Sequence, residues 1–338
     1  MIKNILYIWA MGMGDSILSI PFFLKLKQKW YKITLLRYHA RYFWKHFHYS
    51  TDEIINLLKD NNLIDDILLI PYNKISLLLF IFKNLLRFDI VYIPTKTFFS
   101  MLWAKLLGKK QVVFFQNINN NQIYSGLVQG LLQNNNTTNL FSYRERLNIQ
   151  TDSFCFKSYG IINKFITIYP SIFERSINAS EWSKIISFIE NKWLQVVFIG
   201  WEREKRLYKD LISYKHKNII DLCWKTNLKT IMSILSSSEV NISANGGIMW
   251  LWHLLNKNNI SFHTTSWFIT EPPVNNIHSF NIRKYTYPCC KPCEPFYYRF
   301  AWKEGIPCCV FAWTKREGEC RKSITWDNII TYLKKILH

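Results

Sequence analysis

Four short segments combine glycines, hydroxyls and charged side chains at points where an apolar run gives way to a helical pattern. In the first, MGMGDSILSIP, Gly14 and Asp15 follow the apolar residues 5–9. A glycine lets a ligand approach the backbone, and a carboxylate at this point can accept a proton from an attacking hydroxyl group. Asp15 is therefore a candidate general base, although an aspartate at a helix start also serves as an ordinary N-cap.

The second and third segments have groups that bind a nucleoside diphosphate. The loop YPSIFERS places Ser171 and Arg175 ahead of a helix, where amide, hydroxyl and guanidinium groups can all donate to a diphosphate. The turn IGWEREKR places Glu202 and Glu204 at a helix start, where a carboxylate can accept the ribose hydroxyls. Two simpler explanations stay open: an exposed loop arginine, and acidic residues that favour the first helical turn because of the helix dipole.

The fourth segment, ISANGGIMWLW, ends a strand near Asn245 and opens a helix with Gly246 and Gly247. Paired glycines at such a turn allow a sugar or diphosphate to reach the backbone, and the helix N-terminus favours negative charge. A tight turn without a ligand is the alternative.

Cysteines are concentrated near the C-terminal end of the chain. Six of the eight fall within residues 289–320. The CxxC spacing of Cys290 and Cys293 suits a tetrahedral metal, and either Cys308 or Cys309 could complete four thiolates together with Cys320. A structural zinc or iron site is one hypothesis, and packed, reduced thiols are the other.

The elements that must position these groups alternate between short apolar strands and helical stretches. Such alternation predicts an α/β protein, and its restart after the middle of the chain predicts two parallel sheets facing a central cleft. The expected parts are a first domain over residues 1–155, a second over 156–325, and a C-terminal helix over 326–338 that packs back toward the first.

Composition and charge limit the class of protein. A chain of 338 residues, 49% of them hydrophobic, is long enough for two globular domains. The formal net charge of +20 attracts nucleic acid, anionic lipid or a phosphorylated substrate. The most apolar segment, residues 75–82, is far shorter than the roughly 20 residues that span a bilayer. We expect a cytoplasmic protein without a signal peptide or transmembrane helix.

The order of the four segments resembles glycosyltransferase family 9, the heptosyltransferases of lipopolysaccharide biosynthesis, and the resemblance spans nearly the whole chain. That family has the GT-B fold of two Rossmann-like domains, the first for the acceptor and the second for the nucleotide-sugar donor. Its N-terminal turn reads Gly-Asp followed by apolar residues and a proline, which Gly14, Asp15 and Pro21 match. The resemblance implies that Asp15 is the general base.

The family's second signature, D-[ST]-G-x-M-H-L, is only partly kept. Asn245 removes a pure acceptor, Gly246 removes a hydroxyl, and Trp250 offers a stacking face in place of a titratable ring. Arg175 stands where the family has a diphosphate-binding lysine, so the charge is kept. The donor-binding residues predicted from the segments and the resemblance together are Gly14, Ser171, Arg175, Glu202, Glu204, Asn245, Gly246, Gly247 and Met249.

The resemblance implies an inverting glycosyltransferase that needs no metal for catalysis. Its donor would be ADP-type, favouring ADP-heptose, and its acceptor a membrane-associated glycolipid of the lipopolysaccharide type or another glycoconjugate. Many family members have a similar cysteine pattern before the last helix, and relatives that glycosylate autotransporters are thought to hold iron there. This points to a structural metal on Cys290, Cys293, Cys320 and one of Cys309 and Cys308, with Cys309 taken as the working choice.

Two other functions are weighed against this one. A basic nucleic-acid-binding protein with a metal ribbon would explain the charge, but the double α/β organisation argues against a nucleic-acid partner. A degenerate, non-catalytic relative would explain the changed signature, but the retained Asp15 argues against it. The basic residues Lys74, Lys83 and Arg87 would instead hold the enzyme peripherally at the inner face of the cytoplasmic membrane, unless their helix merely packs on the first sheet.

Overall fold

The protein consists of two compact units, Met1–Ile149 and Gln150–His338. The boundary expected from the sequence was after residue 155. The computed structural model describes residues 2–8, 13–38, 48–93, 98–113, 156–170, 177–200, 211, 216, 218–244, 246–255, 257–263, 279–282 and 323–337.

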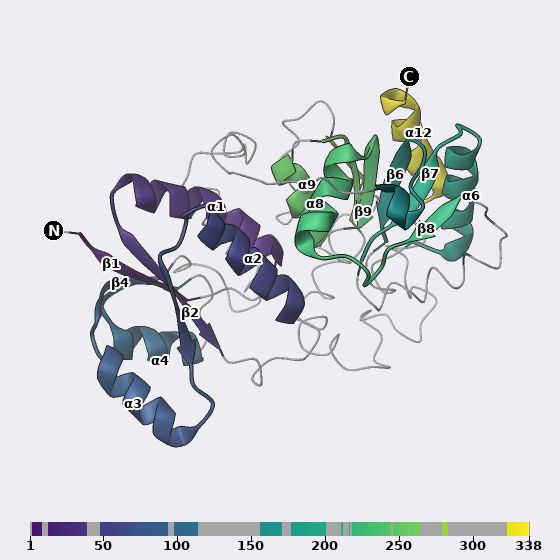
Figure 1. Cartoon of the computed structure of the whole chain (residues 1–338). Coiled ribbons are helices and arrows are strands. Elements are labelled where there is room, and N and C mark those ends of the chain that lie inside the picture. Colours follow the sequence, from purple (N-terminus) through teal and green to yellow (C-terminus); the bar gives the residue numbers. More distant parts are fainter. Residues whose placement is uncertain are drawn as a thin grey trace, which may run out of the picture. The chain divides into compact units, whose positions relative to one another are not determined.

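The first unit is built on a five-stranded parallel sheet with the strand order β3-β2-β1-β4-β5. Figure 1 shows α1 and α2 on one face of this sheet and α3 and α4 on the other, as right-handed crossovers to either side of β1 require. The strands are β1 (Asn4–Ile8), β2 (Lys32–Tyr38), β3 (Asp66–Ile70), β4 (Phe88–Ile93) and β5 (Gly108–Val113). The helices are α1 (Met13–Gln28), α2 (His48–Asp60), α3 (Lys74–Asn84) and α4 (Phe98–Leu107).

Strand β1 lies inside the first sheet and anchors α1. All of β1 after Asn4 is buried, which explains its continuous apolar sequence. The hydroxyl groups of Tyr7 and Ser19 share a buried hydrogen bond of 2.8 Å. The Tyr7 ring also lies edge-on to that of Phe23, with centroids 4.9 Å apart. These contacts fix α1, and therefore its first turn, against the end of β1.

The second unit has a six-stranded parallel sheet with the order β11-β10-β9-β6-β7-β8. Its strands are β6 (Phe165–Tyr169), β7 (Gln195–Phe198), β8 (Ile219–Asp221), β9 (Val240–Ala244), β10 (Asn259–Phe262) and β11 (Ser279–Ile282). The 3-10 turn η4 (Phe156–Tyr159) precedes β6, and the helices are α6 (Ala179–Glu190), α8 (Leu228–Ser237), α9 (Gly247–Leu255) and α12 (Trp326–Ile336).

The C-terminal helix α12 is part of the core of the second unit. Ile329, Ile330 and Leu333 are buried in the same cluster as Trp182 and Ile185 of α6. These three residues form a single apolar stripe along α12, and the stripe is buried because α12 packs on α6. The structure makes this helix a layer of the second unit, and the expectation that it packs back toward the first domain stays a prediction.

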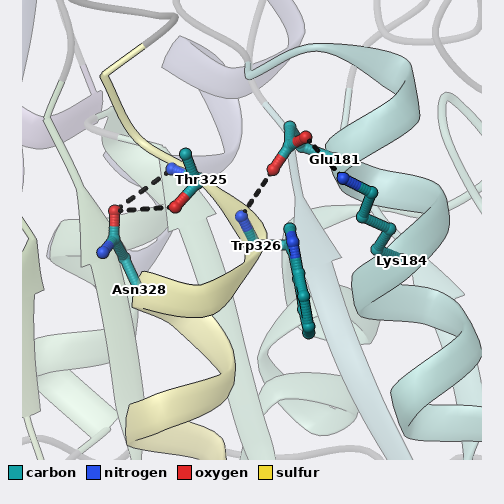
Figure 2. Close-up of polar contacts among 5 residues, drawn as sticks. All are labelled: Glu181, Lys184, Thr325, Trp326 and Asn328. Carbon is teal, nitrogen blue, oxygen red and sulfur yellow. Dashed lines mark hydrogen bonds and ion pairs between the residues drawn. The ribbon is translucent and has the colours of Figure 1, made fainter.

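Figure 2 shows how α12 begins. The Trp326 N–H group donates to Glu181 Oε2 of α6 over 2.7 Å. The N–H and hydroxyl groups of Thr325 donate to Asn328 Oδ1 over 3.1 and 3.3 Å. Side-chain acceptors therefore satisfy amide groups that have no partner within the helix. Among the helices of the described residues, none is long and apolar enough to cross a membrane.

Candidate functional site

The proposed base lies in the first turn of α1, at the carboxyl end of β1. The strand ends at Ile8 and the helix begins at Met13, which makes Gly14 and Asp15 its second and third residues. An N-cap residue precedes the first helical residue, so this placement does not fit the N-cap alternative. Only the backbone of Asp15 is described.

The position of β1 in its sheet is a favourable one for ligand binding. Strand β2 lies on one side of β1 and β4 on the other, so the chain order reverses here. Ligands of open parallel sheets bind beyond the carboxyl ends of the strands at such a reversal. The fold therefore places the Gly14–Asp15 turn where the first unit is expected to bind a substrate.

The three segments predicted to bind the donor follow neighbouring strands of the second sheet. Residues 171–175 follow β6, residues 202–204 follow β7, and the turn 245–247 follows β9. The strands are adjacent in the order β9-β6-β7, and β6 is the point where the chain order reverses. Because parallel strands end at the same edge, the three strands that precede these segments have their carboxyl ends side by side at one edge of the sheet. Ser171, Arg175, Glu202, Glu204 and Asn245 themselves lie outside the described residues.

Gly246 lies against Tyr169, the last residue of β6. A Cβ atom at Gly246 would be 3.1 Å from Tyr169 Cε1 and 3.5 Å from its hydroxyl oxygen. The missing side chain therefore lets Gly246, in the turn after β9, lie close to the end of β6. Where the family pattern has serine or threonine, this chain brings the Tyr169 hydroxyl close instead. Sequence reasoning missed this residue; its only signal was the Tyr-Pro pair that ends an apolar strand.

Helix α9 is enclosed on all sides. Every residue from Ile248 to Leu255 is buried, as expected for a helix that is apolar all round. Met249 is 0% exposed and Trp250 is 4% exposed. Their side chains are therefore core residues in this structure, and the donor contact predicted for Met249 and the stacking face predicted for Trp250 stay predictions. Gly247 opens the helix, at the edge where β9 ends.

A buried polar network fastens α9 to the sheet. Asn259 Nδ2 lies 3.2 Å from His253 Nε2 of α9 and 2.7 Å from Ser261 Oγ. Asn259 Oδ1 accepts a longer hydrogen bond, of 3.4 Å, from Ser243 Oγ. Because an amide nitrogen only donates, His253 Nε2 accepts and the ring is neutral. Burial lowers the pKa of His253 to about 3. The network fixes the helix that begins at the Gly246–Gly247 turn.

The cysteines predicted to hold a metal, Cys290, Cys293, Cys309 and Cys320, lie outside the described residues. Within the part of the chain that is described, no group of three or more histidine, cysteine or acidic residues could hold a metal ion. Cys223, which is described, is a buried cysteine that forms no disulfide bond with any described residue. The metal site therefore stays a prediction.

Solved structures of glycosyltransferases have a similar fold. The chain is similar to the family 9 glycosyl transferase of Veillonella parvula DSM 2008, with a TM-score of 0.65 and 13% identity over 99% of this chain and 97% of that one. It is equally similar to the E. coli ADP-heptose lps heptosyltransferase II, with a TM-score of 0.65 and 11% identity over 99% and 98% of the two chains. The chain has the GT-B fold. The predicted fold class is thereby confirmed.

A third similar structure is TibC, an iron-containing dodecameric glycosyltransferase from enterotoxigenic E. coli H10407. Its TM-score is 0.58 at 11% identity, and the match covers 99% of this chain and 76% of that one. No family model matches the sequence, and neither does any curated protein. The similarity to these structures is therefore one of fold.

Proposed function

We propose that the protein is an inverting glycosyltransferase that takes a sugar from a nucleotide donor. The observation that carries the proposal is that β9, β6 and β7, the strands that directly precede the three predicted donor-binding segments, are neighbours in one parallel sheet. Between them the three segments have the hydroxyl, guanidinium, carboxylate and helix-start amide groups that a nucleoside diphosphate needs. The GT-B fold shared with the Veillonella and E. coli enzymes supports the same conclusion.

For the donor we propose ADP-heptose, the sugar nucleotide in the name of the E. coli heptosyltransferase II. Arg175 follows β6 and would pair with the diphosphate, because a guanidinium group can hold phosphate oxygens in bidentate fashion. Helix α6 follows the same loop, and its N-cap residue Asn178 makes no side-chain cap hydrogen bond. The amide N–H groups in the first turn of α6 would also donate to the diphosphate.

In the proposed reaction Asp15 accepts the proton of an acceptor hydroxyl group. The hydroxyl oxygen forms a bond to the anomeric carbon of the donor sugar, and the bond from that carbon to the diphosphate breaks. The electron pair of the broken bond leaves with ADP, whose charge Arg175 balances. A single displacement of this kind inverts the anomeric configuration, and in this proposal it requires no metal ion.

The acceptor we propose is a membrane-associated glycolipid of the lipopolysaccharide type. Such molecules have phosphorylated sugars, and a net charge of +20 would draw them to the protein. The first unit would bind the acceptor, because the proposed base Asp15 follows β1, the strand at which the strand order of this unit reverses.

The test is a transfer assay with the full-length protein and a panel of ADP-, UDP-, GDP- and dTDP-sugars. A truncated lipopolysaccharide serves as acceptor, and mass spectrometry follows both the acceptor and the released nucleotide. We expect ADP release and an acceptor that is heavier by one heptose. Tight binding of ADP-heptose without any transfer would favour the non-catalytic relative. Salt-sensitive binding of nucleic acid without nucleotide binding would favour the basic binding protein.

A further inference from the structure

Helix α3 of the first unit is apolar on both of its sides. The inner side is buried in the core of that unit through Phe80, with Leu77 and Ile81 packed beside it. The outer side has four large apolar residues that are between 59% and 76% exposed. These outer residues, called the outer stripe below, are Ile75, Leu78, Leu79 and Phe82.

The spacing of the outer stripe places it on one face of the helix. Its members stand at positions i, i+3, i+4 and i+7, which line up along one side of an α-helix. Exposed apolar residues scattered singly are normal, but a contiguous group of this kind marks an interaction site. We therefore expect another molecule to cover the outer stripe.

Two further leucines extend the exposed apolar surface beyond the end of α3. Leu85 is 51% exposed and Leu86 is 48% exposed. Leu86 has a φ angle of 49°, in the left-handed region that glycine adopts readily and a leucine only at a cost. Its N–H group donates to the Leu106 carbonyl oxygen over 3.0 Å, which holds this conformation. An apolar side chain is thus kept half-exposed at a position where glycine would fit more easily.

The charges around the outer stripe are almost all positive. Lys74 precedes it, Lys83 lies within α3, and Arg87 follows. Over residues 67–107 the sequence has a single acidic residue, Asp89. Its carboxylate already accepts from Lys109 Nζ over 3.0 Å and from the Asn4 N–H group over 2.9 Å. No other carboxylate from residues 67–107 offsets the three cations.

We propose that the outer stripe, with Leu85 and Leu86, docks the protein on an anionic lipid bilayer. Charge selects this occupant, because a second copy of the chain would bring another +20 against the first, whereas anionic lipid neutralises it. Apolar residues flanked by lysine and arginine are typical of helices that lie in the membrane interface. With 11 residues, α3 is about 16 Å long and therefore lies in the interface without crossing it.

Docking through α3 has a consequence for the first unit, and only this consequence rests on the proposed function. The start of α3 follows β3 and the start of α1 follows β1. Both strands belong to the same parallel sheet, so both helix starts lie at its carboxyl edge. Lipid contact at Ile75 would therefore bring the edge that holds Asp15 toward the bilayer surface, where a lipid-linked acceptor is found.

The docking surface is tested by co-sedimentation of the full chain with vesicles of phosphatidylglycerol and phosphatidylethanolamine, compared with pure phosphatidylcholine. We expect binding to the anionic vesicles and release at high salt. The substitutions Ile75→Ser and Ile162→Ser form a matched pair, because both isoleucines are 70% exposed and only Ile75 lies in the outer stripe. Combining Ile75→Ser with Phe82→Ser should weaken binding by about tenfold or more, and Lys83→Gln by about fivefold.

Equal binding of the Ile75→Ser and Ile162→Ser variants would overturn the proposal, as would equal binding to zwitterionic and anionic vesicles. A dimer in analytical ultracentrifugation that Ile75→Ser/Phe82→Ser dissociates would make a second copy the occupant. Circular dichroism checks that each variant is folded. Transfer to a soluble acceptor analogue, measured in parallel, should be unchanged by the α3 variants, which separates failure of the docking surface from failure of the proposed function.

Discussion

Glu181 in the first turn of α6 accepts a hydrogen bond of 2.7 Å from the backbone of Trp326, the first residue of α12, 145 positions later in the chain. Its other carboxylate oxygen lies 3.2 Å from Lys184 Nζ, which in turn lies 5.8 Å from the centre of the Trp326 ring (Figure 2). One carboxylate therefore stands near the positive ends of two helices and ties the C-terminal helix to the core of the second unit.

Replacing Glu181 should destabilise the second unit. We expect Glu181→Ala to lower the free energy of unfolding by about 1–3 kcal/mol, because it leaves the Trp326 N–H group without its acceptor and removes a charge-assisted hydrogen bond. Urea denaturation measures the change. Glu239→Ala is the matched control, since its carboxylate pairs with the exposed Lys164 and should contribute less than about 1 kcal/mol. Equal losses in the two variants would show that Glu181 is only another surface charge.

The contact between Gly246 and Tyr169 predicts a coupled pair. Gly246→Ala should destabilise the protein by about 1–3 kcal/mol, because the new methyl group meets the tyrosine ring at 3.1 Å. In a Tyr169→Ala background the same substitution should cost much less, which a double-mutant cycle of unfolding free energies would reveal.

Gly160→Ala is the control for this cycle. Gly160 has a φ angle of 79°, so alanine is strained there, but the nearest atom to its added Cβ is Ile220 Cδ1 at 4.0 Å. The cost of Gly160→Ala should therefore be independent of Tyr169. If the cycle at Gly246 shows no coupling, the close contact does not set the shape of this turn.

The sequence predicts local elements well and distant contacts poorly. The apolar run over residues 165–169 forms β6, and the apolar run that follows the glycine pair forms α9 over Gly247–Leu255. Strand β11, with the sequence SFNI, cannot be recognised from the sequence, because four mixed residues at a sheet edge have no periodic pattern of their own. The contacts Glu181–Trp326 and Gly246–Tyr169 join residues far apart in the chain, and no local pattern specifies such pairs.

Asp15→Asn tests the general base. The amide keeps the size of the side chain but cannot take a proton, so we expect transfer to fall by about 100-fold to 10,000-fold. Isothermal titration calorimetry should show unchanged ADP binding. Asp60→Asn, at the exposed end of α2, is the control and should leave transfer intact. Near-normal turnover of Asp15→Asn would assign the base to another residue.

The cysteine-rich segment makes a prediction that can be checked without any activity. If Cys290, Cys293, Cys309 and Cys320 bind one metal, protein purified under reducing conditions without chelators should contain about one equivalent of zinc or iron. Cys309→Ser should lose the metal and lower the melting temperature, whereas Cys223→Ser should keep the metal. Elemental analysis distinguishes iron from zinc. Metal-free protein would leave the cysteines as packed thiols.

The neutral, buried His253 predicts a pH dependence of stability. Its pKa is about 3 in the folded protein, because burial disfavours the charged ring, and about 6.5 when unfolded. The unfolded chain therefore binds one more proton than the folded one between these values. The stabilisation is complete above pH 6.5 and is lost as the pH falls, at up to about 1.4 kcal/mol per pH unit.

The measurement is urea unfolding of wild-type protein and a His253→Gln variant at several values between pH 7.5 and pH 5. Glutamine has an acceptor for Asn259 but no titratable ring, so its stability should fall less steeply with acid. The difference between the two unfolding free energies should therefore change by about 2 kcal/mol between pH 7.5 and pH 5. Parallel curves would mean that the histidine ring reaches water and titrates in the folded protein, so that Asn259 does not hold α9 through a neutral ring.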